Sequence, residues 1–261
     1  MRRLGWVLAM LAGPALAGPL PKADAVFPPV DPASAELGRL LFFDPVLSGN
    51  RTVSCATCHH PRNATSDGLS LGFGDGGRGL GPDRVTDPDN MPERRVPRNS
   101  TALFNLGATE FVHFFHDGRL EEDPSKPGGI RSPLGQDMVE GFKSALSAQA
   151  MFPVLSGDEM AGHYSENEIS RLVRQGLLAQ PGGAWDEIAA RVSAIPAYRA
   201  LFEAAMPGEP ITFANIANVI AGFIAFEWRA DDAPFDRAMA GGPPLSPMAQ
   251  AGQELFYGAA G

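Results

Sequence analysis

Two cysteines and the histidine next to them are the residues best suited to chemistry. Cys55, Cys58 and His59 form the pattern C-x-x-C-H, which is the attachment sequence of c-type haem. On a helix, residues three apart share a face, so both thiols can reach one porphyrin. The imidazole of His59 can coordinate the iron. The pattern predicts covalent haem attachment with His59 as an axial ligand.

Three other uses of these cysteines fit less well. A thioredoxin-like motif belongs in a β-α-β setting, which the surrounding sequence does not indicate. A zinc site needs further ligands. His60 is adjacent, but the chain has no other cysteine. A disulfide across two intervening residues would be unusual.

The N-terminus has the pattern of an export signal. Residues 1–17 begin with Arg2 and Arg3, continue through an apolar stretch at 4–11 and end in Ala-Leu-Ala at 15–17. These are the three parts of a secretory signal peptide, and an uncleaved anchor is the alternative. No later segment offers 18 uninterrupted apolar residues, so we expect no membrane span after cleavage. We expect a periplasmic protein, in the compartment where bacteria mature cytochromes c.

Composition limits the partners. The chain has 261 residues, 21 Lys and Arg against 30 Asp and Glu, and a net charge of -9. Loss of the signal would remove Arg2 and Arg3 and make the charge more negative still. Such an acidic chain is not expected to bind nucleic acid. With 44% hydrophobic residues it can form one large domain or two small ones.

The hydrophobic pattern predicts a mainly α fold with long Gly/Pro-rich loops. Residues 61–100 are expected to form one long irregular loop, and no segment shows the alternation of a strand. The expected helices run from a Ser34 cap to about Phe43, over 142–151, after a capping box at Ser165 and Glu168, over 185–195 and 197–206, from a Thr212 cap to about Arg229, and from Ser246-Pro247 onward.

The wider sequence resembles the bacterial di-haem cytochrome c peroxidase family, which includes the methylamine-utilisation di-haem enzymes. The strings that carry the resemblance are LGRLLFFDP at 37–45, LS at 47–48, SCATCH at 54–59, PRNS at 97–100, DGR at 117–119 and APFDR at 233–237. The resemblance implies a cytochrome c-like domain that reduces hydrogen peroxide. A second haem would supply its electrons from a small donor protein, a cytochrome c or a cupredoxin.

The resemblance also implies roles for three further residues. Gln149 and Glu159 match the glutamine and glutamate that line the peroxide pocket of similar enzymes. Glu159 would move a proton between the peroxide oxygens, and Gln149 would orient the peroxide. A solvent-exposed carboxylate in a polar run is the alternative for Glu159. Asn99 matches a ligand of an inter-domain calcium ion, although a turn residue before a helix is an equally plain explanation.

Two departures from the family pattern concern histidines. The chain has five, at 59, 60, 113, 116 and 163. None lies between 61 and 112, where many relatives carry a histidine that blocks the iron, so we expect an iron that is open or water-bound at rest. His116 stands where relatives have a tryptophan that relays electrons between the haems, and a packed structural histidine is the alternative. His113 and His163 have no assigned role.

The end of the sequence predicts a domain boundary. The string GQELF at 252–256 echoes GRLLF at 38–42, which precedes the haem motif. We therefore expect a signal at 1–17, a peroxidatic haem domain at 18–230 and the start of a second, truncated haem domain at 231–261. The chain would carry one haem c, the full-length protein two. A homodimer is left open.

Two other functions remain in view. A methylamine-utilisation type of enzyme would oxidise a residue of another protein. A one-haem electron carrier would need a second axial ligand, for which Met91, Met138, Met151 and Met160 are available.

Overall fold

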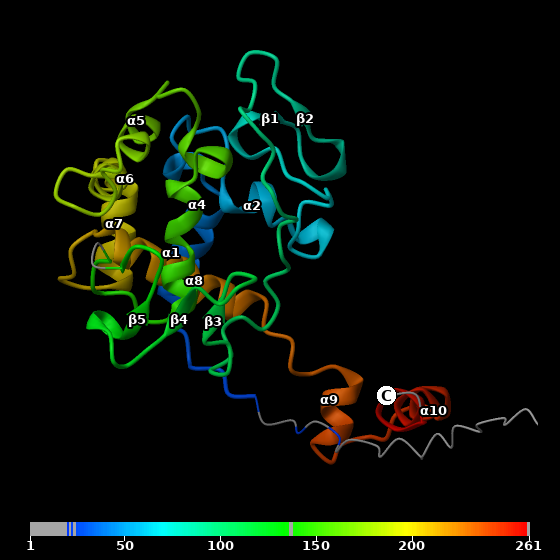
Figure 1. The fold of residues 1–261 in the computed structure, drawn as a ribbon. Helices are drawn as coiled ribbons and strands as arrows, with labels where there is room; N and C mark the ends of the chain where they lie inside the picture. The colour runs from blue at the N-terminus through cyan, green and yellow to red at the C-terminus, as the bar shows by residue number, and fades with distance from the viewer. Residues whose placement is uncertain (1–19, 21, 23–24, 136–137, 260–261) are drawn as a thin grey trace, which may run out of the picture. The chain divides into compact units, whose positions relative to one another are not determined.

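The computed structural model describes residues 20, 22, 25–135 and 138–259 (Figure 1). The expected signal peptide at 1–17 lies outside the described residues. The chain divides into two compact units, one of residues 26–229 and one that contains residues from 230 onward together with the N-terminal residues up to 25. The haem motif and all the other predicted site residues lie in the first unit.

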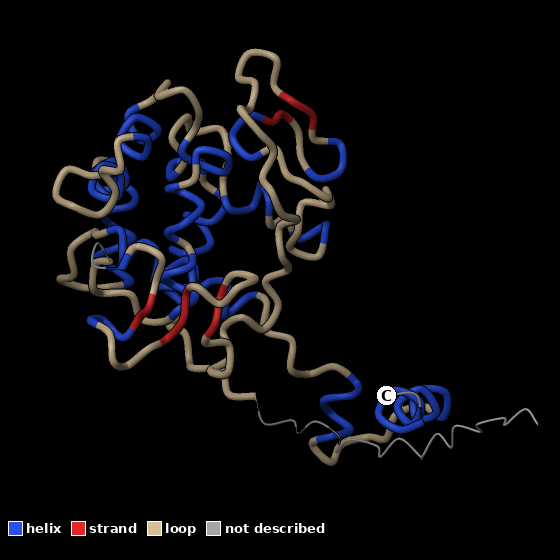
Figure 2. The backbone as a smooth tube through the Cα atoms, viewed as in Figure 1, coloured by secondary structure: helices blue, strands red, loops and turns tan. Residues whose placement is uncertain are grey.

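The prediction of a mainly α fold is confirmed (Figure 2). In the first unit the helices are α1 Pro32–Phe43, α2 Cys55–Cys58, α3 Ala145–Gln149, α4 Met151–Leu155, α5 Glu168–Arg174, α6 Ala184–Ser193, α7 Pro196–Ala205 and α8 Phe213–Glu227, with a π-helical turn, η7, at Gly157–Ala161. The second unit contains α9 Pro234–Met239, α10 Pro247–Glu254 and the turn η8 Leu255–Ala259.

The described residues include five short strands, which the sequence did not predict. Gly77–Arg78 (β1) pairs antiparallel with Val85–Thr86 (β2). His113–Phe114 (β3), Leu120–Glu122 (β4) and Ile130–Arg131 (β5) form a second sheet in the order β3-β4-β5. Strands of two or three residues are too short for an alternating pattern to reveal them.

The core of the first unit forms where α1 packs along α8. Phe42 of α1 lies 5.3 Å from Phe223 of α8 and 5.1 Å from Trp228, measured between ring centroids. Farther along α8, the ring of Phe213 stacks on Trp185 of α6 at 5.1 Å. Because α8 is apolar on most of its circumference, it is buried on several sides.

Two helix starts differ from those expected. Asp31, not Ser34, caps α1: its carboxylate accepts a hydrogen bond from the Ser34 amide at 2.8 Å. Asn167, not Ser165, caps α5, with its side chain accepting from the Ser170 amide at 2.8 Å. Ser165 has a left-handed backbone (φ 59°), which is not the extended conformation of a capping residue. The caps predicted at Thr212 and Ser246 are confirmed.

The helix predicted over 142–151 is also interrupted. Asn218 on α8 donates to the carbonyl of Gly141 at 2.8 Å and accepts from the amide of Lys143 at 2.9 Å. These bonds hold 141–143 outside a helix, so α3 begins only at Ala145. The polar residue that interrupts the most apolar helix thus positions the element that carries Gln149. No helix in the described part of the chain is long and apolar enough to cross a membrane.

Candidate haem site

The haem motif lies on a single helical turn. The Ser54 amide donates to the Thr57 hydroxyl at 2.9 Å, and the His59 amide donates to the Cys55 carbonyl at 2.9 Å, so α2 is closed at both ends. Both cysteines are free thiols. Burial raises the pKa of Cys55 to about 12 and that of Cys58 to about 11. Thiols with raised pKa values are poor thiolate nucleophiles, so they do not fit a redox-active motif.

His59 is oriented through one ring nitrogen. Its Nδ1 donates to the carbonyl oxygen of Thr65 at 3.0 Å, which assigns the proton to Nδ1 and leaves Nε2 as the basic nitrogen. Burial is the main cause that lowers the pKa of His59, so the neutral imidazole is favoured. A neutral imidazole whose other nitrogen bonds a backbone carbonyl is the usual form of a metal-binding histidine.

The acceptor carbonyl belongs to a strained turn. Ala64 and Thr65 both have left-handed backbones, with φ of 50° and 60°. Thr65 is buried, and its hydroxyl accepts a hydrogen bond from the Leu103 amide at 2.7 Å. Left-handed non-glycine residues persist only where surrounding contacts hold them. The turn therefore fixes the acceptor for His59.

A second loop closes over the haem motif. The hydroxyl of Ser100 donates to the carbonyl of Cys58, and Ser66 donates to the carbonyl of Ser100 at 2.8 Å. The neighbouring Asn99 donates to the Leu69 carbonyl at 2.6 Å, and its side-chain oxygen accepts from Ser66 at 3.3 Å. Asn99 thus ties two loop segments together. Among the described residues, no cluster of three or more His, Cys, Asp and Glu side chains could hold a metal ion.

Glu159 lies in the middle of η7, close to the haem motif. Burial is the main cause that raises its pKa; Asp158 raises it further, while Ser156 and Arg119 lower it. The charge of Glu159 in turn raises the pKa of Cys58. Glu159 is therefore a half-buried carboxylate within electrostatic reach of the haem turn, which is not the setting of the alternative, a solvent-exposed carboxylate.

Gln149 ends α3 with a buried side-chain oxygen. This Oε1 has no hydrogen-bond partner among the described residues. A buried polar atom without a partner costs about 1–3 kcal/mol, so such atoms mark places where a ligand can bind. The neutral His59 ring and the two protonated thiols on one helical turn fit a c-type haem.

His116 is exposed and directly follows Phe115, which is one ring of an edge-to-face aromatic pair. The preceding Phe115 has a left-handed backbone (φ 62°), and its ring lies 4.9 Å from Phe152 of α4 and 3.8 Å from the guanidinium carbon of Arg119. His116 is therefore not packed in the core, contrary to its structural alternative. This ring pair was not predicted from the sequence. The positive charge of Arg119 lowers the pKa of Glu159.

The other two histidines differ in burial. His113 is exposed and lies 3.0 Å from Glu121 across the sheet. His163 is buried, and its Nε2 has no hydrogen-bond partner among the described residues.

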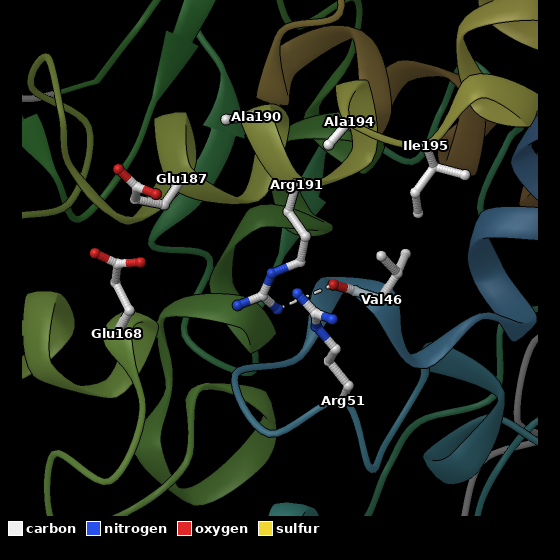
Figure 3. Close-up of a pocket in the computed structure, with 8 residues that line it drawn as sticks. All are labelled: Val46, Arg51, Glu168, Glu187, Ala190, Arg191, Ala194 and Ile195. Carbon is white, nitrogen blue, oxygen red and sulfur yellow. Dashed lines mark hydrogen bonds between the residues drawn. The ribbon is translucent and has the colours of Figure 1, made fainter.

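A surface pocket of about 370 Å³ lies among α5, α6 and the segment before the haem turn (Figure 3). It is lined by Val46, Arg51, Glu168, Glu187, Ala190, Arg191, Ala194 and Ile195, none of them a predicted site residue. Arg191 donates to the carbonyls of Val46 at 3.1 Å and Ser48 at 2.7 Å. The arginine therefore anchors the segment that leads to α2.

The sequence model of the di-haem cytochrome c peroxidases matches residues 32–243. The chain belongs to the di-haem cytochrome c peroxidase family. The family member MauG of Methylorubrum extorquens, a methylamine utilization protein, is 29% identical over 245 residues, which are 93% of this chain and 50% of MauG. The cytochrome-c peroxidase IdrP2 of Pseudomonas sp. (strain SCT) is 30% identical over 93% of this chain and 48% of its own length.

Solved structures of di-haem proteins share the fold. A MauG-like protein associated with microbial copper homeostasis aligns with a TM-score of 0.54 and 26% identity, over 98% of this chain and 55% of that one. The di-haem peroxidase BthA of Burkholderia thailandensis aligns with a TM-score of 0.51 and 19% identity, over 92% and 49%. The chain spans about half the length of the curated relatives it matches.

Proposed function

We propose that this chain is the peroxidatic, haem-bearing part of an exported di-haem peroxidase. Cys55 and Cys58 would hold the haem through thioethers, and His59 would coordinate its iron. The observation that carries the proposal is that the half-buried Glu159 lies within electrostatic reach of the turn that bears Cys58 and the neutral, carbonyl-oriented His59. The two cysteines of the chain provide one C-x-x-C-H motif, which would hold one haem.

The reaction proposed is the reduction of hydrogen peroxide by two electrons and two protons to two water molecules. The haem supplies the electron transfer to the O–O bond. The carboxylate of Glu159 accepts a proton from one peroxide oxygen and donates it to the other, which leaves as water. A carboxyl with a raised pKa suits both halves of that transfer near neutral pH. Gln149 holds the peroxide in the orientation that the transfer needs.

Several finer assignments belong to the same proposal. Residues 18–230 form the peroxidatic domain, and 231–261 begin a second one. A small cytochrome c or cupredoxin in the periplasm supplies the electrons, and His116 relays them. Asn99 contributes to a calcium site. The loop at 61–100 leaves the iron open at rest, since it contains no histidine.

The experiment compares the haem-loaded protein with its Glu159→Gln variant. Stopped-flow absorbance follows the reaction with hydrogen peroxide, and we expect the variant to react at least about 100-fold more slowly, the usual contribution of a general acid–base. Glu168→Gln is the control, since Glu168 is an exposed residue of α5. Equal rates for Glu159→Gln and the unmodified protein would refute the proposed role of Glu159.

A methylamine-utilisation type of reaction is the second candidate. Two observations favour it: the similarity to MauG at 29% identity and the alignment with a MauG-like structure. Steady-state turnover of peroxide with reduced cytochrome c separates the two candidates. Sustained oxidation of the cytochrome supports the peroxidase. Reaction with peroxide but no oxidation of any cytochrome or cupredoxin donor supports the second candidate.

A further inference from the structure

The turn that carries Glu159 is clamped between two loops. On one side, the Gly49 amide donates to the Met160 carbonyl at 2.7 Å. The contact is so close that a Cβ at position 49 would lie 1.9 Å from the Ala161 carbonyl oxygen. Asn167 also donates to that oxygen, at 2.9 Å. One side of η7 is thus fixed by the segment just before the haem motif.

The other side of η7 rests on Gly74. This residue has a left-handed backbone (φ 56°), and a Cβ there would lie 1.8 Å from the Asp158 carbonyl oxygen and 2.9 Å from the Cα of Glu159. The backbone of the loop at 74–84 therefore lies directly against the residue that carries the carboxylate. Any shift of Gly74 must shift Glu159 or open the contact.

The position of Gly74 is set by a buried arginine. Arg84 is 5% exposed; one terminal nitrogen donates to the Gly74 carbonyl and the other to the Gly79 carbonyl at 2.8 Å. The loop that these bonds close is glycine-rich and contains the two-residue β1–β2 ladder (Figure 1). Beside Gly74, the buried Asp75 also accepts hydrogen bonds from Asn50, Thr52 and Asn90. A planar guanidinium can bond two carbonyls in fixed directions, which a lysine cannot.

Burying a charged guanidinium is costly, so its place in this loop needs a reason. Desolvation lowers the pKa of Arg84, and the nearby Cys58, Asp75 and Asp67 raise it.

We propose that Arg84 is a positioning residue for Glu159. Its guanidinium fixes the Gly74 carbonyl, and the Gly74 backbone fixes the turn that holds the carboxylate. This inference rests on the proposed role of Glu159 in peroxide cleavage. It predicts that loss of the Arg84 hydrogen bonds slows the reaction with peroxide only as long as a carboxylate is present at position 159.

The test is a double-mutant cycle on the haem-loaded protein. Arg84→Met is expected to slow the reaction with hydrogen peroxide about 10- to 100-fold, since small misplacements of reacting groups cost factors of that size. Haem content and the ferric absorption spectrum are expected to stay unchanged. Arg84→Lys, which keeps the charge, is expected to recover only part of the rate. Arg78→Met is the control, because Arg78 lies in the same loop but is exposed and pairs with Asp87 and Asp89.

The decisive comparison is made in the Glu159→Gln background. There, Arg84→Met is expected to change the rate less than about 2-fold, because a residue that acts through another has no effect once that other is removed. An equal loss in both backgrounds, or a parent-like rate for Arg84→Met beside a slow Glu159→Gln, would overturn the inference alone. A parent-like rate for Glu159→Gln would overturn the proposed function instead. If Arg84→Met does not load haem, Gly74→Ala disturbs the same contact and completes the same cycle.

Discussion

The Nδ1 atom of His59 lies 3.0 Å from the carbonyl oxygen of Thr65, six residues later in the chain. The bond spans a turn in which Ala64 and Thr65 have left-handed backbones. A change in the conformation of this turn would therefore break the bond. The Thr65 hydroxyl fixes the far side of that turn through the Leu103 amide at 2.7 Å. One buried hydroxyl therefore contributes to the orientation of the His59 ring, beside the backbone bonds between His60 and Ser66 and between Thr65 and His60.

Thr65→Val tests this dependence. The substitution keeps the size of the side chain but leaves the Leu103 amide buried without an acceptor, a change that costs about 1–3 kcal/mol. We expect the free energy of unfolding to fall by that amount, with haem still attached. Denaturant titration of the haem-loaded protein measures it, and Thr109→Val serves as the control because Thr109 is exposed. An unchanged midpoint for Thr65→Val would show that the turn holds without the hydroxyl.

Glu159 should lower the stability of the protein at neutral pH. Its folded-state pKa lies above the ordinary value of 4.5, so between these two pKa values the folded protein binds more protons than the unfolded chain. Stability from the protonated carboxyl is present below the ordinary pKa and is lost as pH rises through the folded pKa. Glu159→Gln should therefore unfold at a higher temperature than the unmodified protein at pH 7, because it carries no charge at this half-buried position.

The control for the difference in melting temperature is a measurement at low pH. At a pH below the ordinary glutamate pKa, both variants carry a neutral side chain, and their melting temperatures should converge. The same carboxyl should give the acid limb of the rate of reaction with peroxide, with loss of rate as pH falls through the raised pKa. A constant difference in melting temperature at every pH would contradict the assignment.

The resting iron should be open on the face opposite His59. The loop at 61–100 contains no histidine. It is held by backbone hydrogen bonds and by the side chains of Arg84 and Asn99. We expect a high-spin ferric signal in the electron paramagnetic resonance spectrum without prior reduction, and binding of cyanide to the resting protein. A low-spin bis-histidine or histidine–methionine spectrum would contradict this expectation.

Patterns of local chemistry predicted much of the fold. The motif at Cys55 to His59 and the capped helices at Thr212 and Ser246 depend on residues close in sequence, and the structure has them. The predicted cap of α5 was wrong because serine and asparagine are about equally favourable at the N-cap, and both Ser165 and Asn167 stand before the helix. The choice between them depends on a left-handed backbone that the sequence does not encode plainly.

The less predictable parts depend on contacts between distant segments. In the sequence, Arg84 is one of several charged residues in a glycine-rich loop. It is buried because that loop packs on the turn that carries Glu159. Asn218 reads as an interruption of an apolar helix, yet it binds 141–143 from 75 or more residues away. Such long-range hydrogen bonds leave no periodic signal in a sequence.

The intact mass of the purified, exported protein tests the central claim most directly. The account predicts a polypeptide carrying one covalently bound haem, with a Soret band that stays with the protein after acid–acetone extraction and is lost to extraction in the Cys55→Ala, Cys58→Ala double variant. A mass equal to that of the bare polypeptide, without Soret absorption, would contradict it.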